Sequence, residues 1–179
     1  MWTVYLINTW LVIGILSVKG KLTLILTVEI LLVSRKSKEF IAFWIDNQCY
    51  SNTTREDYVN ELKKYILVDD FGSCFNHACD EECFAEKSHK YFFFLAFENN
   101  FCPDYVSNPF WMALRHPIVP VVLGGSDYSK IAPENSFIDV KQFKNAQDLG
   151  SHLNFVAKNE VTFKSIEFQS TLIISTIYS

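Results

Sequence analysis

Short apolar runs alternate with amphipathic stretches from residue 40 onward. Short runs that are mainly apolar predict strands at 40–45, 66–71, 91–97, 118–123 and 137–140. Apolar positions spaced by three or four residues predict helices at 55–65, 81–89, 108–114 and 146–157. The run 91–97 has no polar face, as is typical of a strand buried on both sides. Because strands and helices alternate, we expect an α/β fold with a doubly wound parallel sheet over residues 38–160.

The amino-terminal part has a different pattern. Residues 2–18 are almost entirely apolar. After a short lysine-rich break, a second apolar run occupies residues 22–33. A helix needs about 20 apolar residues to cross a bilayer, so residues 1–37 are predicted to be a hydrophobic segment that anchors the chain in a membrane. Two alternatives stay open: the second run is a buried strand or helix, or residues 1–35 come from a mispredicted gene start. Residues 161–179 are expected to form a divergent tail.

Composition limits the class of protein. With 179 residues, of which 49% are hydrophobic and 20% charged, the chain is long enough for one well-filled globular domain. Lys and Arg number 16 and Asp and Glu number 20, which gives a formal net charge of -4. This acidic balance does not favour nucleic acid as a partner.

Five cysteines and one glycosylation sequon favour the secretory pathway. The sequon begins at Asn52, and the odd number of cysteines leaves at least one thiol without an internal partner. Three of the cysteines lie near His77 with a spacing that also suits zinc. An oxidising lumen favours disulfides over a metal site, although the pairing cannot be deduced from the sequence. The disulfide candidates are Cys49, Cys74, Cys79, Cys83 and Cys102.

Ligands of doubly wound sheets bind beyond the carboxyl ends of the strands. Two polar loops, 46–55 and 98–105, follow predicted strands and therefore meet this condition. Arg55 lies where the first of these loops enters a helix, and a guanidinium offers paired donors to phosphate oxygens. The alternative is that Arg55 is a solvated helix-start residue.

Several ordered blocks of the chain resemble the α-1,3-fucosyltransferase family. Residues 94–100 (FLAFENN), 104–107 (DYVS), 110–115 (FWMALR) and 119–124 (VPVVLG) are similar to the family's FYLAFENS, DYVTEKFWNAL and VPVVLG segments. Upstream, residues 55–66 resemble the family's REDYVEELMKYI segment, with Cys49 at the position of its preceding cysteine. The resemblance covers about residues 40–160.

The resemblance implies an inverting Golgi enzyme with two Rossmann-like domains and a single membrane span, whose luminal part transfers L-fucose from GDP-fucose to the 3-OH of N-acetylglucosamine in glycans. No metal or other cofactor is required. This chain would be the carboxy-terminal, donor-binding half. It would bind GDP-fucose, and a glycan acceptor only if an acceptor domain is supplied. The donor-binding residues implied are Arg55 for the diphosphate, Glu98 and Asn99 for the sugar and nucleotide side, Tyr105 for the nucleotide and Asn108 for the ribose.

Two departures from the family pattern bear on catalysis. Where the family has Thr-Glu-Lys, this chain has Ser107-Asn108-Pro109, which removes a carboxylate and a phosphate-binding lysine. The family's carboxylate base belongs to the acceptor domain, and no catalytic residue is identifiable in this chain. One alternative is therefore a catalytically inactive GDP-binding remnant or truncated gene product. Another is a small membrane-anchored structural protein, for which the similar blocks would have to be accidental.

Overall fold

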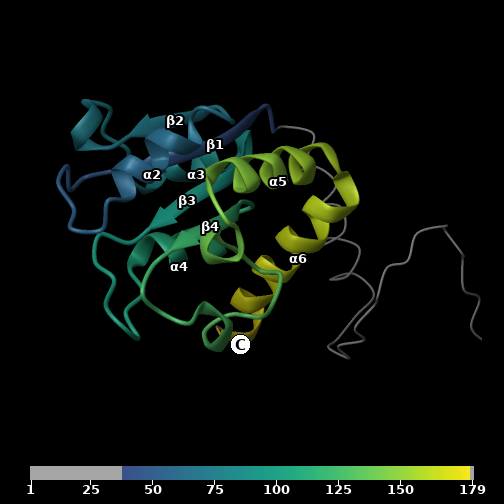
Figure 1. Ribbon diagram of the computed structural model, residues 1–179. Coiled ribbons are helices and arrows are strands. Elements are labelled where there is room, and N and C mark those ends of the chain that lie inside the picture. Colours follow the sequence, from purple (N-terminus) through teal and green to yellow (C-terminus); the bar gives the residue numbers. More distant parts are fainter. Residues whose placement is uncertain (1–37, 178–179) are drawn as a thin grey trace, which may run out of the picture.

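The computed structural model describes residues 38–177, and the predicted membrane segment lies outside them. The described chain forms a five-stranded sheet in the order β2-β1-β3-β4-β5, with every neighbouring pair parallel (Figure 1). This confirms the predicted doubly wound α/β fold. The strands are β1 (Phe40–Ile45), β2 (Val68–Phe71), β3 (Tyr91–Phe97), β4 (Val119–Leu123) and β5 (Ile138–Asp139).

Helices cover both faces of the sheet (Figure 1). One core cluster joins the sheet to α2, α5 and α6, and a second cluster joins the opposite face to α3 and α4. The helices are α2 (Arg55–Leu62), α3 (Glu81–Lys90), α4 (Asn108–Leu114), α5 (Ala146–Lys158) and α6 (Glu160–Ile177), with short 3-10 turns η1 (Ser73–Phe75), η2 (Tyr128–Lys130) and η3 (Val140–Gln142).

The central strand β3 supplies both core clusters. All seven of its residues are buried, as the unbroken apolar run predicts. Because successive side chains of a strand point to opposite faces, Phe93 and Leu95 pack toward α5 and α6 while Phe94 and Ala96 pack toward α3 and α4. The aromatic run is therefore part of the core on both faces of the sheet.

The segment after α2 differs from the prediction. We expected the helix to continue to residue 65 and the next strand to begin at 66, whereas α2 ends at Leu62 and β2 begins at Val68. The backbone N–H groups of Tyr65 and Ile66 both donate to the carbonyl of Leu62, which closes the helix with a turn. Leu67 is left exposed in the connection, which its apolar character did not predict.

Residues 161–179, for which only a divergent tail was expected, include a packed helix. In this helix, α6, Phe163 and Ile166 are buried in the same core cluster as α5. The hydroxyl of Ser170, one turn further along the same helix face, donates to the carbonyl of Ser136 at 2.6 Å. The packed core therefore continues beyond residue 160. Within residues 38–177 no helix is long and apolar enough to cross a membrane.

A buried lysine stands at the amino edge of the sheet, just before β1. Lys38 Nζ donates to the carbonyls of Ser88, Tyr91 and Pro117 at 2.8, 2.9 and 2.5 Å, and it lies 3.9 Å from a carboxylate oxygen of Glu167. Burial lowers the pKa of Lys38 to about 8, against the opposing charge of Glu167. This one cation thus connects β3, the entry to β4 and α6.

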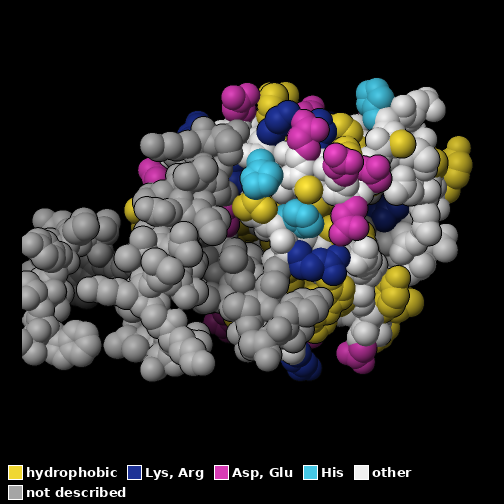
Figure 2. All heavy atoms as spheres, turned by 180° about the vertical axis from the view of Figure 1, so that it is seen from behind, with side chains coloured by type: hydrophobic (Ala, Val, Ile, Leu, Met, Phe, Trp, Pro, Cys, Tyr) yellow, Lys and Arg dark blue, Asp and Glu magenta, His cyan; other side chains and the backbone are white. Residues whose placement is uncertain are grey.

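Figure 2 shows the molecule from behind. On the described part of this face, Lys and Arg side chains alternate with Asp, Glu and His side chains, with apolar atoms between them. Charges of opposite sign lie close together there, so their fields largely cancel over distances beyond a Debye length.

Candidate functional site

The carboxyl ends of β1 and β3 form the point where the strand order reverses. From β1 the chain proceeds to one side of the sheet through β2, and from β3 it proceeds to the other side through β4. Ligands of doubly wound sheets bind in the crevice at such a point. The residues that directly follow these two strands are Asp46 and Glu98, and both are buried.

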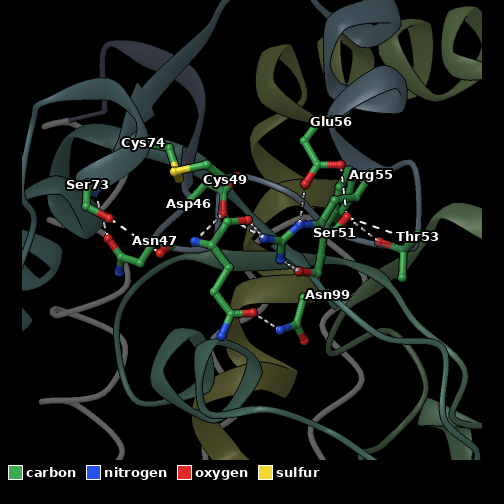
Figure 3. Close-up of polar contacts among 12 residues, drawn as sticks. Asp46, Asn47, Cys49, Ser51, Thr53, Arg55, Glu56, Ser73, Cys74 and Asn99 are labelled. Carbon is green, nitrogen blue, oxygen red and sulfur yellow. Dashed lines mark hydrogen bonds and ion pairs between the residues drawn. A yellow bond between two sulfur atoms is a disulfide. The ribbon is translucent and has the colours of Figure 1, made fainter.

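Arg55, the first residue of α2, connects the two strand ends. Its Nη2 donates to Asp46 Oδ1 at 2.6 Å (Figure 3). Nη2 also donates to the Gln48 carbonyl at 3.3 Å, and Nη1 donates to the Phe97 carbonyl at 2.9 Å. Its Nε donates to Glu56 at 3.3 Å. The Arg55 side chain is therefore buried and held by four acceptors. The alternative of a solvated helix-start residue is wrong.

Hydroxyl groups attach the loop before α2 to the end of β3. The Thr53 hydroxyl donates to the Glu98 carbonyl at 3.1 Å, and the Ser51 hydroxyl donates to Glu56 at 2.9 Å. Thr54, the residue before the helix, has a left-handed backbone with φ of 52°. Its side chain makes no cap hydrogen bond, so the loop depends on these hydroxyl contacts for its position.

Glu98 lies beneath the site. Its Oε1 accepts from the backbone N–H of Ser107 at 2.9 Å, whereas its Oε2 has no hydrogen-bond partner among residues 38–177. The buried hydroxyl of Tyr128 likewise has none. Burial and then the charges of Glu98 and Asp139 raise the pKa of Tyr128.

Gly124, at the end of β4, is required by this crowding. A Cβ at that position would lie 2.4 Å from the Tyr128 hydroxyl and 2.8 Å from Cγ of Glu98. Any larger residue would displace one of these two side chains. Gly124 is therefore a packing requirement of the site's floor.

The other predicted donor-binding residues lie on the rim. The side-chain amide of Asn99 donates to the side-chain carbonyl of Gln48, whose backbone holds Arg55. Tyr105 is half exposed, and its backbone carbonyl accepts from Ser126. Asn108 is exposed at the first position of α4. Arg55 and Glu98 thus form the floor of the site, and the three rim residues lie at two loop positions and at the start of α4.

Sequence reasoning missed three polar residues of this edge. Asp46, Gln48 and Thr53 were not singled out, although each contacts Arg55 or Glu98. A signal was present for Asp46, because it directly follows a buried apolar strand. The other two act through backbone contacts or a single hydroxyl, which no sequence pattern reveals.

Two disulfides lie beside the site. Cys49 pairs with Cys74 and attaches the loop after β1 to η1 (Figure 3), and Cys79 pairs with Cys83. Disulfide formation is confirmed, and the zinc alternative is wrong because these sulfurs are bonded to one another. Cys102 is a free, exposed thiol, so its expected disulfide is absent from residues 38–177.

A pocket of about 560 Å³ lies elsewhere, between β5, α5 and α6. Gln142, Phe143 and His152 are among its lining residues, and none of the predicted donor-binding residues is. Burial lowers the pKa of His152. The candidate site is therefore the strand-order reversal and not this pocket.

The chain matches the family profile described as Glycosyltransferase family 10 (fucosyltransferase) C-term over residues 34–169. It belongs to this fucosyltransferase family. Alpha-(1,3)-fucosyltransferase C of Drosophila melanogaster is 36% identical to this chain over 118 residues. These residues are 64% of this chain and 28% of the relative. Alpha-(1,3)-fucosyltransferase fut-1 of Caenorhabditis elegans is 33% identical over 136 residues, or 74% and 31%. The family member thus spans under a third of these relatives.

A solved structure agrees with the fold of this family member. The crystal structure of an α1,3-fucosyltransferase with GDP-fucose has a TM-score of 0.63 at 20% identity, covering 75% of this chain and 39% of the solved one. At that identity the likeness shows the fold. The predicted family resemblance and fold class are both confirmed.

Proposed function

We propose that this chain is the GDP-fucose-binding half of an α-1,3-fucosyltransferase that transfers L-fucose to N-acetylglucosamine of a glycan. The observation that carries the proposal is the convergence of Arg55, Asp46 and Glu98 at the point where the strand order reverses. Membership of the fucosyltransferase family supplies the donor and the reaction type.

Arg55 faces the diphosphate with one remaining donor. A guanidinium has five N–H groups, and four of them are directed at Asp46, Gln48, Phe97 and Glu56. The fifth, on Nη1, is left for a phosphate oxygen. Because the other four fix the plane of the guanidinium, it needs no reorganisation as GDP leaves and negative charge develops on the phosphate.

Glu98 acts on the donor through the loop that it holds. Its carboxylate accepts from Ser107, so it sets where α4 begins and where the preceding loop turns. Asn99, Tyr105 and Asn108 then flank the bound nucleotide and sugar from the exposed side. The base that deprotonates the acceptor hydroxyl is supplied by an acceptor domain, as the family resemblance implies.

The cellular setting follows from the same assignment. The two disulfides support an oxidising lumen, and we place the protein in the Golgi with its donor domain on the luminal side. A single-pass anchor within residues 1–37 remains part of this proposal.

GDP binding without transfer is the second candidate. The first turn of α4 carries Asn108 and Pro109, so it presents neither the carboxylate nor the lysine of the family motif. Losing a charged phosphate contact costs about 1.5–3 kcal/mol, which lowers donor affinity about 10- to 100-fold. Transfer and binding therefore need separate measurements.

The binding test uses thermal stability of the full chain with GDP and with guanosine. GDP at 100 times its dissociation constant adds about 2.7 kcal/mol to the free energy of unfolding. Arg55→Lys keeps one charge but loses the fork, so we expect GDP affinity to fall about 10-fold while guanosine affinity is unchanged. Arg115→Lys, at the exposed arginine that directly follows α4, is the matched control.

No thermal shift at millimolar GDP would remove the binding claim. An equal loss of GDP and guanosine affinity in Arg55→Lys would show damage to the fold. Incubation with GDP-fucose and an N-acetylglucosamine acceptor then separates the two candidates: fucosylated product supports transfer, and GDP binding without product supports the second candidate.

A further inference from the structure

The loop between β1 and α2 exposes an aromatic side chain next to the sequon. Tyr50 is 99% exposed, the highest value among the large hydrophobic residues of the described chain. Asn52, two residues later, is also exposed and lies in a turn. An aromatic ring left wholly in water gains nothing from its apolar surface, so Tyr50 is available to a partner that covers it.

The rest of this loop is rigidly held. Thr53 is buried and bonds to the Glu98 carbonyl, Arg55 is fixed by four acceptors, and Cys49 is cross-linked to Cys74. Asn52 therefore points outward from a fixed base. It also begins the single Asn-X-Ser/Thr sequence in the entire chain, with Thr54 as its hydroxyl residue.

We propose that Asn52 carries an N-linked glycan whose first N-acetylglucosamine packs on the ring of Tyr50. The C–H groups on one face of a pyranose ring are apolar and carry partial positive charge, which suits the negative face of an aromatic ring. Tyr50 and Asn52 are two residues apart in the same exposed loop, and this sequence proximity is the basis for pairing the ring with the sugar. The inference does not depend on the proposed transferase activity.

The modification transfers an oligosaccharide from a lipid carrier to Asn52 in the secretory lumen. Asn52 Nδ2 forms a bond to C1 of N-acetylglucosamine, and C1 breaks its bond to the pyrophosphate oxygen of a lipid-linked oligosaccharide. The amide loses one proton to solvent, and the lipid pyrophosphate leaves with the bonding electrons. Neither oxidant nor reductant is needed. The two disulfides favour an oxidising lumen, the kind of compartment in which this modification takes place.

Occupancy is tested by translating the full chain in the presence of microsomes. We expect a mass increase that an N-glycan-cleaving amidase removes and that is absent in Asn52→Gln and Thr54→Ala. Thr53→Ala, which changes the neighbouring threonine but keeps the sequon, retains the mass increase. A chain that is protected from protease yet unmodified overturns the proposal, as does a chain that remains outside the microsomes.

Packing on Tyr50 is tested by a double-mutant cycle on the full chain purified from microsomes. Tyr50→Ala should lower the melting temperature of the glycosylated protein by about 2–4 °C and that of the Asn52→Gln protein by less than about 1 °C. Leu67→Ala, at an exposed apolar residue without a sequon, is the matched control and should shift both forms equally. Equal Tyr50→Ala shifts in the two forms would overturn the packing claim.

Discussion

Two buried cations lie at opposite edges of the same sheet. Lys38 stands at the amino edge and donates to three backbone carbonyls, with Glu167 3.9 Å away. Arg55 stands at the carboxyl edge and is fixed by Asp46 at 2.6 Å together with carbonyls. Both are desolvated, yet their chemistry differs: burial lowers the pKa of Lys38 to about 8, whereas a guanidinium stays charged.

The two edges of the sheet differ in how completely the donors of the buried cation are satisfied. At the amino edge an ammonium group with three donors matches three carbonyls, so the site is closed and structural. At the carboxyl edge a guanidinium with five donors meets four acceptors, and the proposed function assigns the fifth N–H to a phosphate oxygen. Lys38, whose pKa is lowered, is thus at the amino edge, and the guanidinium of Arg55 is at the carboxyl edge, where we propose that the ligand binds.

The largest expected effect is a loss of stability when Lys38 is replaced at the amino edge. Lys38→Met leaves three buried carbonyls without their donor and removes the cation beside Glu167, so the free energy of unfolding should fall by about 3–5 kcal/mol. Urea denaturation measures this change. Lys130→Met, which removes an exposed lysine paired with Asp127, is the control and should change stability little.

Measuring the GDP affinity of Lys38→Met tests whether the two edges are independent. Because Lys38 contacts nothing at the carboxyl edge, the folded fraction of Lys38→Met should bind GDP as the unmodified chain does. A loss of stability below about 1 kcal/mol, or a fall in GDP affinity parallel to the fall in stability, would refute the separation of the two edges.

A smaller effect follows from pH. The pKa of Lys38 is about 8 in the folded chain and about 10.4 when unfolded, so between these values the unfolded state holds more protons and stability rises with pH. From pH 8 to 10 the gain should be about 2 kcal/mol. Burial raises the pKa of Tyr91 and Tyr128, so above pH 10 the folded state holds more protons and stability falls.

The measurement is urea denaturation between pH 7 and 11 in a Cys102→Ser background, which prevents thiol exchange. Lys38→Met should abolish the rise below pH 10 and leave the fall above it. A rise that persists in Lys38→Met would assign it to another group.

The smallest effect compares two buried tyrosines. The hydroxyl of Tyr91, at the amino edge, donates to Asp69 at 2.5 Å, whereas that of Tyr128 has no hydrogen-bond partner in the described chain. Tyr91→Phe should therefore cost about 1 kcal/mol, and Tyr128→Phe should be neutral or slightly stabilising. Thermal denaturation checks both variants. Equal costs would mean that Tyr128 bonds to Glu98 in solution.

Elements with a strong local signal were predicted well. The strand predicted at 91–97 agrees with β3. Its sequence signal is a run of seven apolar residues, and all seven are buried in the structure. The helix at 108–114 agrees with α4 because Pro109 suits a first helical turn. Both results follow from interactions within a few residues of each other.

Elements that depend on distant contacts were not predicted. Helix α6 forms because Phe163 and Ile166 find the core beside α5, and the sequence does not show that this surface is there. The pairing of Arg55 with Asp46 requires a nine-residue loop to close, and that closure depends on Thr53 and a disulfide. The sequence predicts that the five donor-binding residues lie together at the carboxyl edge of the sheet. Which of them are buried in the floor and which lie on the rim depends on tertiary packing.

The strand order also governs how the chain folds during its synthesis. Phe40 of β1 pairs with Tyr91 of β3, about 50 residues later. At roughly 5–20 residues per second, a ribosome needs about 3–10 s to bring β3 to its partner. Until then one edge of β1 has no neighbour, and its apolar side chains lack half of their core. A translational pause before residue 91 prolongs that exposure, whereas a pause after residue 140 finds the central strands already paired.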